Sequence, residues 1–187
     1  NWGHLPASYA NMNLFIAGGA YHLSGTPYLG AAKTTADDGI NTATYTPKAT
    51  DDGVTWTPTV PRSVAGGGSV DVTATCPGAP TNPCYLNAWI DFDNNSVLDP
   101  GEQIFTNQAL ALNGTNTYTL TFPITDDSNF DGTTLYSRFR LTDGLVASPA
   151  PGGVAVDGSA IPLIGEIEDP FFQVTGDVVT PVTVASF

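Results

Sequence analysis

The chain has 187 residues, which suits one β domain with an appended arm. Its 18 acidic and 5 basic residues give a formal net charge of −13, which argues against binding to nucleic acid or to anionic membranes. Twenty Gly, fifteen Pro and many β-branched residues leave no window for a long helix, so we expect an all-β fold.

Residues 1–65 are expected to form an irregular N-terminal arm packed on the rest of the chain, because Gly-Gly, Asp-Gly and Pro interrupt every run. Acidic pairs occur here and elsewhere. Such a pair is either part of a solvated acidic surface or a ligand pair for a divalent cation. Asp51 and Asp52 are therefore candidate cation ligands.

Strands with alternating apolar and polar residues are predicted from residue 70 onward. The apolar positions are Val70, Val72 and Ala74, then Tyr118, Leu120 and Phe122, then Leu135, Phe139 and Leu141. Each run has one apolar and one polar face, as expected for sheets that share one core. Residues 66–174 therefore predict an antiparallel β-sandwich, Ig-like or jelly-roll-like.

The two cysteines, Cys76 and Cys84, stand at the ends of a proline-rich loop between two predicted strands. This placement favours a disulfide and an oxidising, extracellular compartment. The alternative is two free buried thiols.

The segment from Asp91 to Glu102 has the spacing of a calcium loop. Calcium takes about six to eight oxygen ligands, which a short loop supplies when carboxylates and amides recur at every second residue. The candidate ligands, in EF-hand order, are Asp91, Asp93, Asn95, the backbone carbonyl of Val97, Asp99 and Glu102. Ser96 replaces the usual Gly. The flanking segments are strand-like rather than helical, so we expect a structural Ca²⁺ loop between two strands. The alternative is an acidic hairpin turn without metal.

Glu166 and Glu168 lie two residues apart in a strand-like segment, so they point to one face, about 6.6 Å apart. A glycosidase carboxylate pair is disfavoured because nothing marks an aromatic-lined cleft. Two other roles stay open. Either Glu reaches the calcium of the Asp91–Glu102 loop, or one pairs with Arg138 or Arg140.

Residues 175–187 form a β-prone tail, and its segment 178–187 carries no charge. The tail is either an interdomain linker or an edge strand that pairs with another subunit by strand exchange.

Several short segments, in this order along the chain, are similar to a known family. They are 1–9 (Asn-Trp-Gly-His-Leu-Pro-Ala-Ser-Tyr), 28–30, 51–54, 88–93, 101–102, 138–140 and 165–169 (Gly-Glu-Ile-Glu-Asp). Over residues 1 to about 174 the chain resembles the bacterial GEVED domain, together with the Asp-Trp-Gly-Asp-x-Pro-x-Ser-Tyr segment that often precedes it. The resemblance implies a non-catalytic, calcium-binding β-sandwich of secreted or cell-surface bacterial proteins.

The chain departs from the family pattern at Asn1 and His4, where acids are usual, which argues against a cation site in the arm. We expect His4 and His22 to be packed or hydrogen-bonding loop residues rather than ligands.

Three candidate functions are considered. The first is a structural module of a surface assembly, such as a filament, sheath, surface layer or adhesin, joined to other copies or to other domains. The second is a carbohydrate-binding module that uses Trp2, Trp56 or Tyr21. The third, an enzyme, is disfavoured because the chain lacks G-x-S-x-G and H-E-x-x-H motifs and has only two His.

Overall fold

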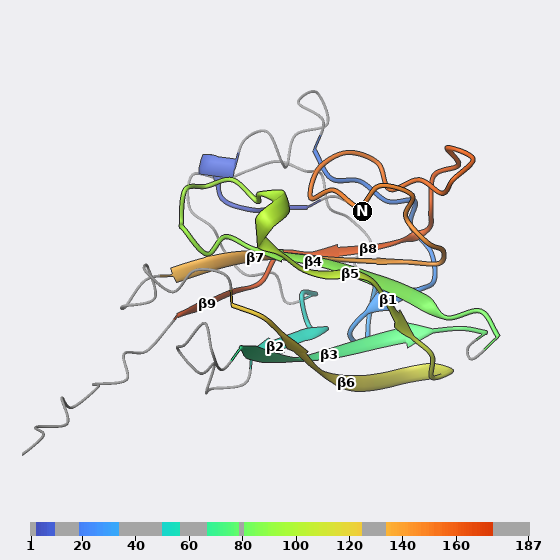
Figure 1. The fold of residues 1–187 in the computed structure, drawn as a ribbon. Coiled ribbons are helices and arrows are strands. Elements are labelled where there is room, and N and C mark those ends of the chain that lie inside the picture. The colour runs from blue at the N-terminus through green and yellow to red at the C-terminus, as the bar shows by residue number, and fades with distance from the viewer. Residues whose placement is uncertain are drawn as a thin grey trace, which may run out of the picture.

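The strands form two antiparallel sheets that pack together as a sandwich (Figure 1). The structure, a computed structural model, describes residues 3–9, 19–33, 50–56, 67–78, 81–124 and 134–173. The predicted all-β sandwich is confirmed. The tail 175–187 and Trp2 lie outside the described residues.

The first sheet is built around β3 (Gly68–Cys76). Strand β6 (Gly114–Phe122) pairs with β3 along its whole length. On the other edge of β3, β1 (Tyr28–Leu29) and β2 (Val54–Trp56) follow each other end to end. The arm therefore contributes two short strands where an irregular segment was expected.

The second sheet has the order β5-β4-β7-β8, and β9 also pairs with β7. The strands are β4 (Cys84–Ile90), β5 (Gln103–Leu110), β7 (Thr134–Thr142), β8 (Gly165–Glu168) and β9 (Phe171–Gln173). Two 3₁₀ turns complete the described elements, η1 (Ala7–Tyr9) in the arm and η3 (Pro100–Glu102) before β5. Strand β8 is the edge strand on the side of this sheet that faces the arm.

The main core lies between the sheets, and β3 shows the alternation that this requires, with every second residue buried. Core residues include Val70, Val72, Leu86, Ile90, Phe105, Phe139 and Leu141. The strands predicted around residues 70–75, 118–122 and 135–141 are confirmed.

Strand β7 departs from the expected alternation, because both of its faces are buried from Ser137 to Thr142. Its predicted polar face carries Arg138 and Arg140, which are 0% and 3% exposed. The arm and the β7–β8 connection (143–164) cover that outer face. On the same face a second cluster contains Leu5 and Tyr9 of the arm together with Trp89 and Leu98.

Candidate metal centre

The segment 91–102 connects β4 to β5 and ends in η3, so the acidic loop joins two strands as predicted. Its turn depends on two residues in the left-handed region, Asn94 (φ 55°) and Ser96 (φ 67°). Ser96 thus adopts the backbone conformation for which the EF-hand pattern uses Gly. The replacement leaves the turn in place.

Three of the predicted ligands converge in this loop. One carboxylate oxygen from each of Asp91, Asp93 and Glu102 lies within 4.8 Å of the others. Asp91 is fully buried and Glu102 is 7% exposed, whereas Asp93 is exposed. The loop therefore gathers its acids around a point with one side open to solvent.

Main-chain amides hold the two buried carboxylates in place. Glu102 Oε1 accepts the N–H of Phe92 at 2.7 Å, and its Oε2 accepts that of Asp99 at 2.9 Å. Asp91 Oδ2 accepts the N–H of Ser96 at 2.9 Å and the hydroxyl of Tyr9, which comes from the arm. These bonds hold the carboxylate oxygens in the arrangement that a cation would require.

Burial disfavours the charged forms of the carboxylates in this loop. Burial raises the pKa of Glu102 to about 7, and the nearby Asp91 adds to that rise. Burial also raises the pKa of Asp91, although the hydroxyl of Tyr9 and two main-chain amides oppose the rise. Burial and the charge of Asp91 raise the pKa of Tyr9 as well. A divalent cation would remove the repulsion that these shifts report.

Asn95, Val97 and Asp99 lie in the same loop. Asn95 Oδ1 accepts the N–H of Val97 at 2.7 Å, and Asn95 Nδ2 donates to Asp93 and Asp99 at 2.9 and 3.4 Å. The predicted binding of a cation by Asn95, Val97 and Asp99 stays a prediction.

The other four predicted cation ligands lie elsewhere, beside the arm. Glu166 accepts the N–H of Leu29 at 2.8 Å, and Glu168 accepts that of Gly53 at 3.0 Å. Asp51 Oδ2 lies 2.7 Å from His4 Nε2, and Asp52 accepts the N–H of Ala31 at 3.2 Å. These contacts tie the arm to itself and to β8. A ligand role for the four acids stays a prediction.

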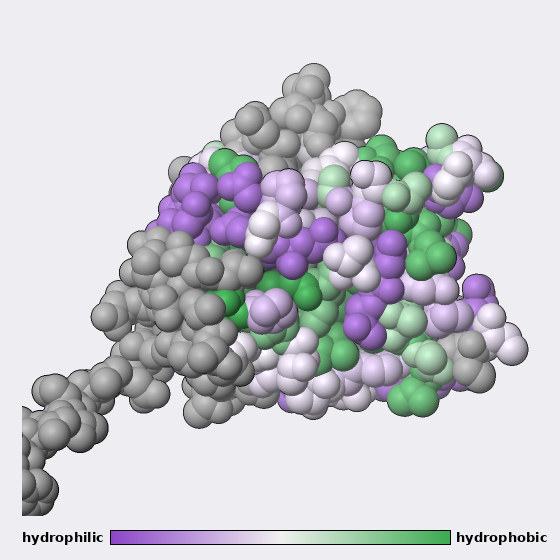
Figure 2. Space-filling model, viewed as in Figure 1, coloured by the Kyte–Doolittle hydropathy of each residue, from purple (hydrophilic) through white to green (hydrophobic). Residues whose placement is uncertain are grey.

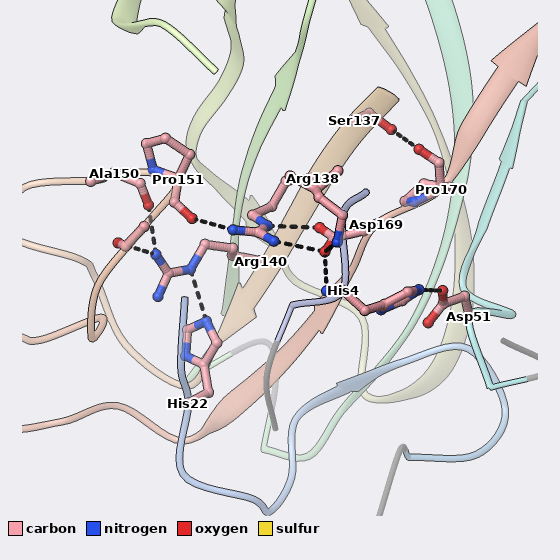
Figure 3. A network of polar contacts seen from close by, with 12 residues as sticks. His4, His22, Asp51, Ser137, Arg138, Arg140, Ala150, Pro151, Asp169 and Pro170 are labelled. Atoms are coloured by element: carbon pink, nitrogen blue, oxygen red, sulfur yellow. Dashed lines mark hydrogen bonds and ion pairs between the residues drawn. The ribbon is translucent and has the colours of Figure 1, made fainter. Parts of the chain in front are cut away.

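Both arginines of β7 have buried partners other than the two Glu (Figure 3). Arg138 pairs with Asp169 at 2.7 Å. Arg140 donates from Nε to His22 Nε2 at 3.1 Å, and its terminal nitrogens donate to backbone carbonyls of residues 21, 150, 152 and 153. His22 is thus a hydrogen-bonding residue, as expected.

Sequence reasoning missed two contacts of this region, Tyr9 with Asp91 and Arg138 with Asp169. Local pattern contains no signal for the first contact, which spans 82 residues. The second joins residues 31 positions apart, and the alternation around Arg138 predicted a polar outer face rather than a buried ion pair.

Cys76 and Cys84 are bonded to each other, with their Cα atoms 5.7 Å apart, so the predicted disulfide is confirmed. A disulfide indicates a non-cytoplasmic environment. Among the described residues, no helix is long and apolar enough to cross a membrane.

The family model of the GEVED domain matches residues 85–173, which confirms the predicted resemblance over that part of the chain. The match begins in β4 and ends with β9, so it includes the acidic loop and the Gly165–Asp169 motif but not β1, β2 or β3. Neither the curated proteins nor the solved structures give a significant match.

Proposed function

We propose, on the premise that residues 85–173 belong to the GEVED domain family, that this chain is a calcium-stabilised structural module of an extracellular bacterial surface assembly. GEVED domains are in general non-enzymatic. The observation that carries the calcium site is the convergence of Asp91, Asp93 and Glu102 on one point.

The donor set fits calcium better than other common metals. It consists of carboxylates, with an amide and a backbone carbonyl nearby in the same loop, and contains neither His nor Cys. Zinc prefers nitrogen and sulfur ligands, and magnesium requires a near-ideal octahedron and usually keeps several waters instead of an all-protein ligand set. Bound calcium would neutralise the acids and fix the β4–β5 connection.

Calorimetry with calcium and with chelator tests the site. Loops of extracellular modules bind calcium with a Kd of about 10⁻⁴–10⁻³ M. At about 10 mM calcium, stability should then rise by about 1.4–2.7 kcal/mol, and Tm should rise by about 3–10 °C.

The variant Glu102→Gln should abolish most of the gain in Tm. The control Asp157→Asn, at a half-buried carboxylate that caps its own loop, should keep the gain. Equal Tm with calcium and with chelator, together with no heat of binding, would refute the calcium site.

An exposed apolar surface supports the assembly part of the proposal. Of the six exposed large hydrophobic side chains in the described part of the chain, four belong to the β7–β8 connection and to segment 21–23, which pairs with it. They are Leu23, Leu145, Val154 and Ile161. Figure 2 shows hydrophobic residues gathered on this side of the molecule. Exposed apolar patches favour contacts between proteins.

Deletion of residues 178–187, followed by light scattering and electron microscopy, tests whether the uncharged tail joins copies. Loss of polymers on deletion would support strand exchange. An unchanged oligomeric state, whether monomer or polymer, would show that the tail does not drive assembly.

Carbohydrate binding is the weaker proposal. The ring of Trp56 packs edge-on against Phe122 and Phe139, with centroids 6.2 and 5.7 Å away, so it serves the core. Tyr21 is only half-exposed.

A further inference from the structure

The acids of the Gly165–Asp169 segment all point at the N-terminal arm, the described residues between 3 and 56. We propose that Glu166, Glu168 and Asp169 form a docking site for main-chain amides of this arm. We further propose that Tyr9 couples occupancy of the docking site to cation binding at Asp91. The coupling rests on the proposed calcium site, whereas the docking site does not.

Asp169 receives the first part of the arm on the outer face of the second sheet. Its Oδ2 accepts the N–H groups of His4 and Leu5 at 2.6 and 3.0 Å (Figure 3). The same carboxylate is held by the guanidinium of Arg138, and both are 0% exposed. A Cβ at Gly3 would lie 2.1 Å from Arg138 Nη2, so the arm passes directly over the ion pair.

Glu166 and Glu168 receive the later parts of the arm on the opposite face of β8. In the antiparallel register Glu166 lies opposite Leu141 and Glu168 opposite Phe139, so both carboxylates share the face of the inter-sheet core. They accept the N–H groups of Leu29 in β1 and of Gly53 just before β2. The two acids thus fasten the first sheet to the edge of the second.

All four donors are backbone N–H groups, and all three acceptors are buried carboxylates. The charge-assisted bond, roughly twice as strong as a neutral one, applies to Asp169, whose pKa Arg138 holds down against burial. Burial and the nearby Asp51 raise the pKa of Glu168, so its carboxyl accepts the arm amide without a full charge, and leaving it unpaired would still be costly. The arm and the three acids therefore stabilise each other. Docking therefore depends on the path of the arm backbone. Small residues are required only where that backbone passes close to another segment, as Gly53 does beside Leu29.

Tyr9 connects this docked arm to the acidic loop. It is 2% exposed, packs edge-on against Tyr136 at 5.7 Å, and donates its hydroxyl to Asp91. A cation bound at Asp91 would hold in place the carboxylate that accepts the Tyr9 hydroxyl, so the docked arm and the cation position the same group. By linkage, the docked arm must then raise cation affinity by the same factor as the cation stabilises docking.

Hydrogen exchange of the full chain in chelator tests the docking site. Glu166→Ala should speed exchange around residues 28–33, and Glu168→Ala around 51–56, by tenfold or more relative to β4. The milder variants Glu166→Gln and Glu168→Gln, which keep side-chain volume, replace any alanine variant that fails to fold. The control Asp157→Asn removes a charge that caps only its own loop and should leave the arm unchanged.

Faster exchange confined to the arm supports the docking site. Unchanged exchange in the arm, or an equal rise in β4, overturns it.

Calcium titration tests the coupling. In the wild type, calcium should slow exchange in residues 3–9, and Tyr9→Phe should remove most of this effect while weakening calcium affinity threefold or more. Measurable heat of calcium binding without any change in residues 3–9, or full affinity in Tyr9→Phe, overturns the coupling. The absence of calcium binding would overturn the coupling and the proposed function together, but the docking site is decided in chelator alone.

Discussion

Replacing Asp169 with Asn should destabilise the fold more than loss of any exposed acid, because this carboxylate is central to the arm contact. Asp169 is fully buried and accepts four hydrogen bonds, two from Arg138 at 2.7 Å each and two from the amides of His4 and Leu5. Asn has only one acceptor oxygen, and its NH₂ group would face the N–H donors that the second carboxylate oxygen now accepts. The substitution leaves the charge of Arg138 buried without its counter-ion.

The expected loss in the free energy of unfolding is about 3–5 kcal/mol, the usual cost of removing one partner of a buried ion pair. Domains have about 5–15 kcal/mol in total, so the variant should be marginal. For a chain of this size, Tm should fall by about 6–20 °C.

The loss should also depend on pH. Burial alone would raise the pKa of Asp169, but the charge and hydrogen bonds of Arg138 outweigh it and hold the pKa below its usual value of 3.8. A carboxyl whose folded pKa is depressed contributes stability above its unfolded pKa and loses it as pH falls through the folded value. The gap between wild type and Asp169→Asn should therefore be full at pH 7 and shrink below about pH 4.

Urea unfolding at several pH values measures this gap, with Asp157→Asn as the matched control at a half-buried, loop-capping carboxylate. The control should lose less than about 1 kcal/mol. A loss below about 1 kcal/mol for Asp169→Asn at pH 7, or a gap that does not change in acid, would refute the structural role assigned to the pair.

Three further outcomes are expected. Intact mass without reductant should show Cys76 and Cys84 bridged, and reduction should lower stability by about 2–3 kcal/mol; two alkylatable thiols in fresh protein would contradict this. Burial, aided by the charge of Arg140, lowers the pKa of His22, so below about pH 6.5 His22 is protonated in the unfolded state but stays neutral in the folded state. The free energy of unfolding should therefore fall by up to about 1.4 kcal/mol for each pH unit below that value. The variant His22→Gln should flatten this slope, and an unchanged slope would show that another group causes it. Gly165→Ala should lose about 1–3 kcal/mol in urea unfolding, because its Cβ would lie 1.9 Å from a backbone carbonyl of β7; a neutral effect would contradict the β7–β8 register.

Patterns within about a dozen residues predicted much of this molecule. The alternation at Val70, Val72 and Ala74 identified β3, and the spacing from Asp91 to Glu102 identified a loop whose acids converge. The sequence also placed Glu166 and Glu168 on one face correctly, since a strand has a period of two.

Partners across the fold could not be predicted, because they depend on how the arm packs. The polar face expected on β7 is buried only because segments from residues 3–9, 19–23 and 143–164 lie over it. The arm was expected to be irregular because β1 has two residues and β2 has three. Strands this short have no period to detect, and they form because β3 and the acids of β8 supply their hydrogen bonds.

The contact at His4 depends on the main chain rather than on the side chain. The group that Asp169 accepts is the backbone N–H of His4, so the contact does not require the imidazole. The side chain is turned instead to Asp51, which is a contact within the arm. A docking site that binds main-chain amides constrains the path of the arm backbone. It also requires small residues where the backbone passes close to other groups, as at Gly3 and Gly53, but it places no requirement on most side chains of the arm. The acids of the Gly165–Asp169 segment are therefore restricted in identity, whereas the arm that they hold is restricted mainly in shape.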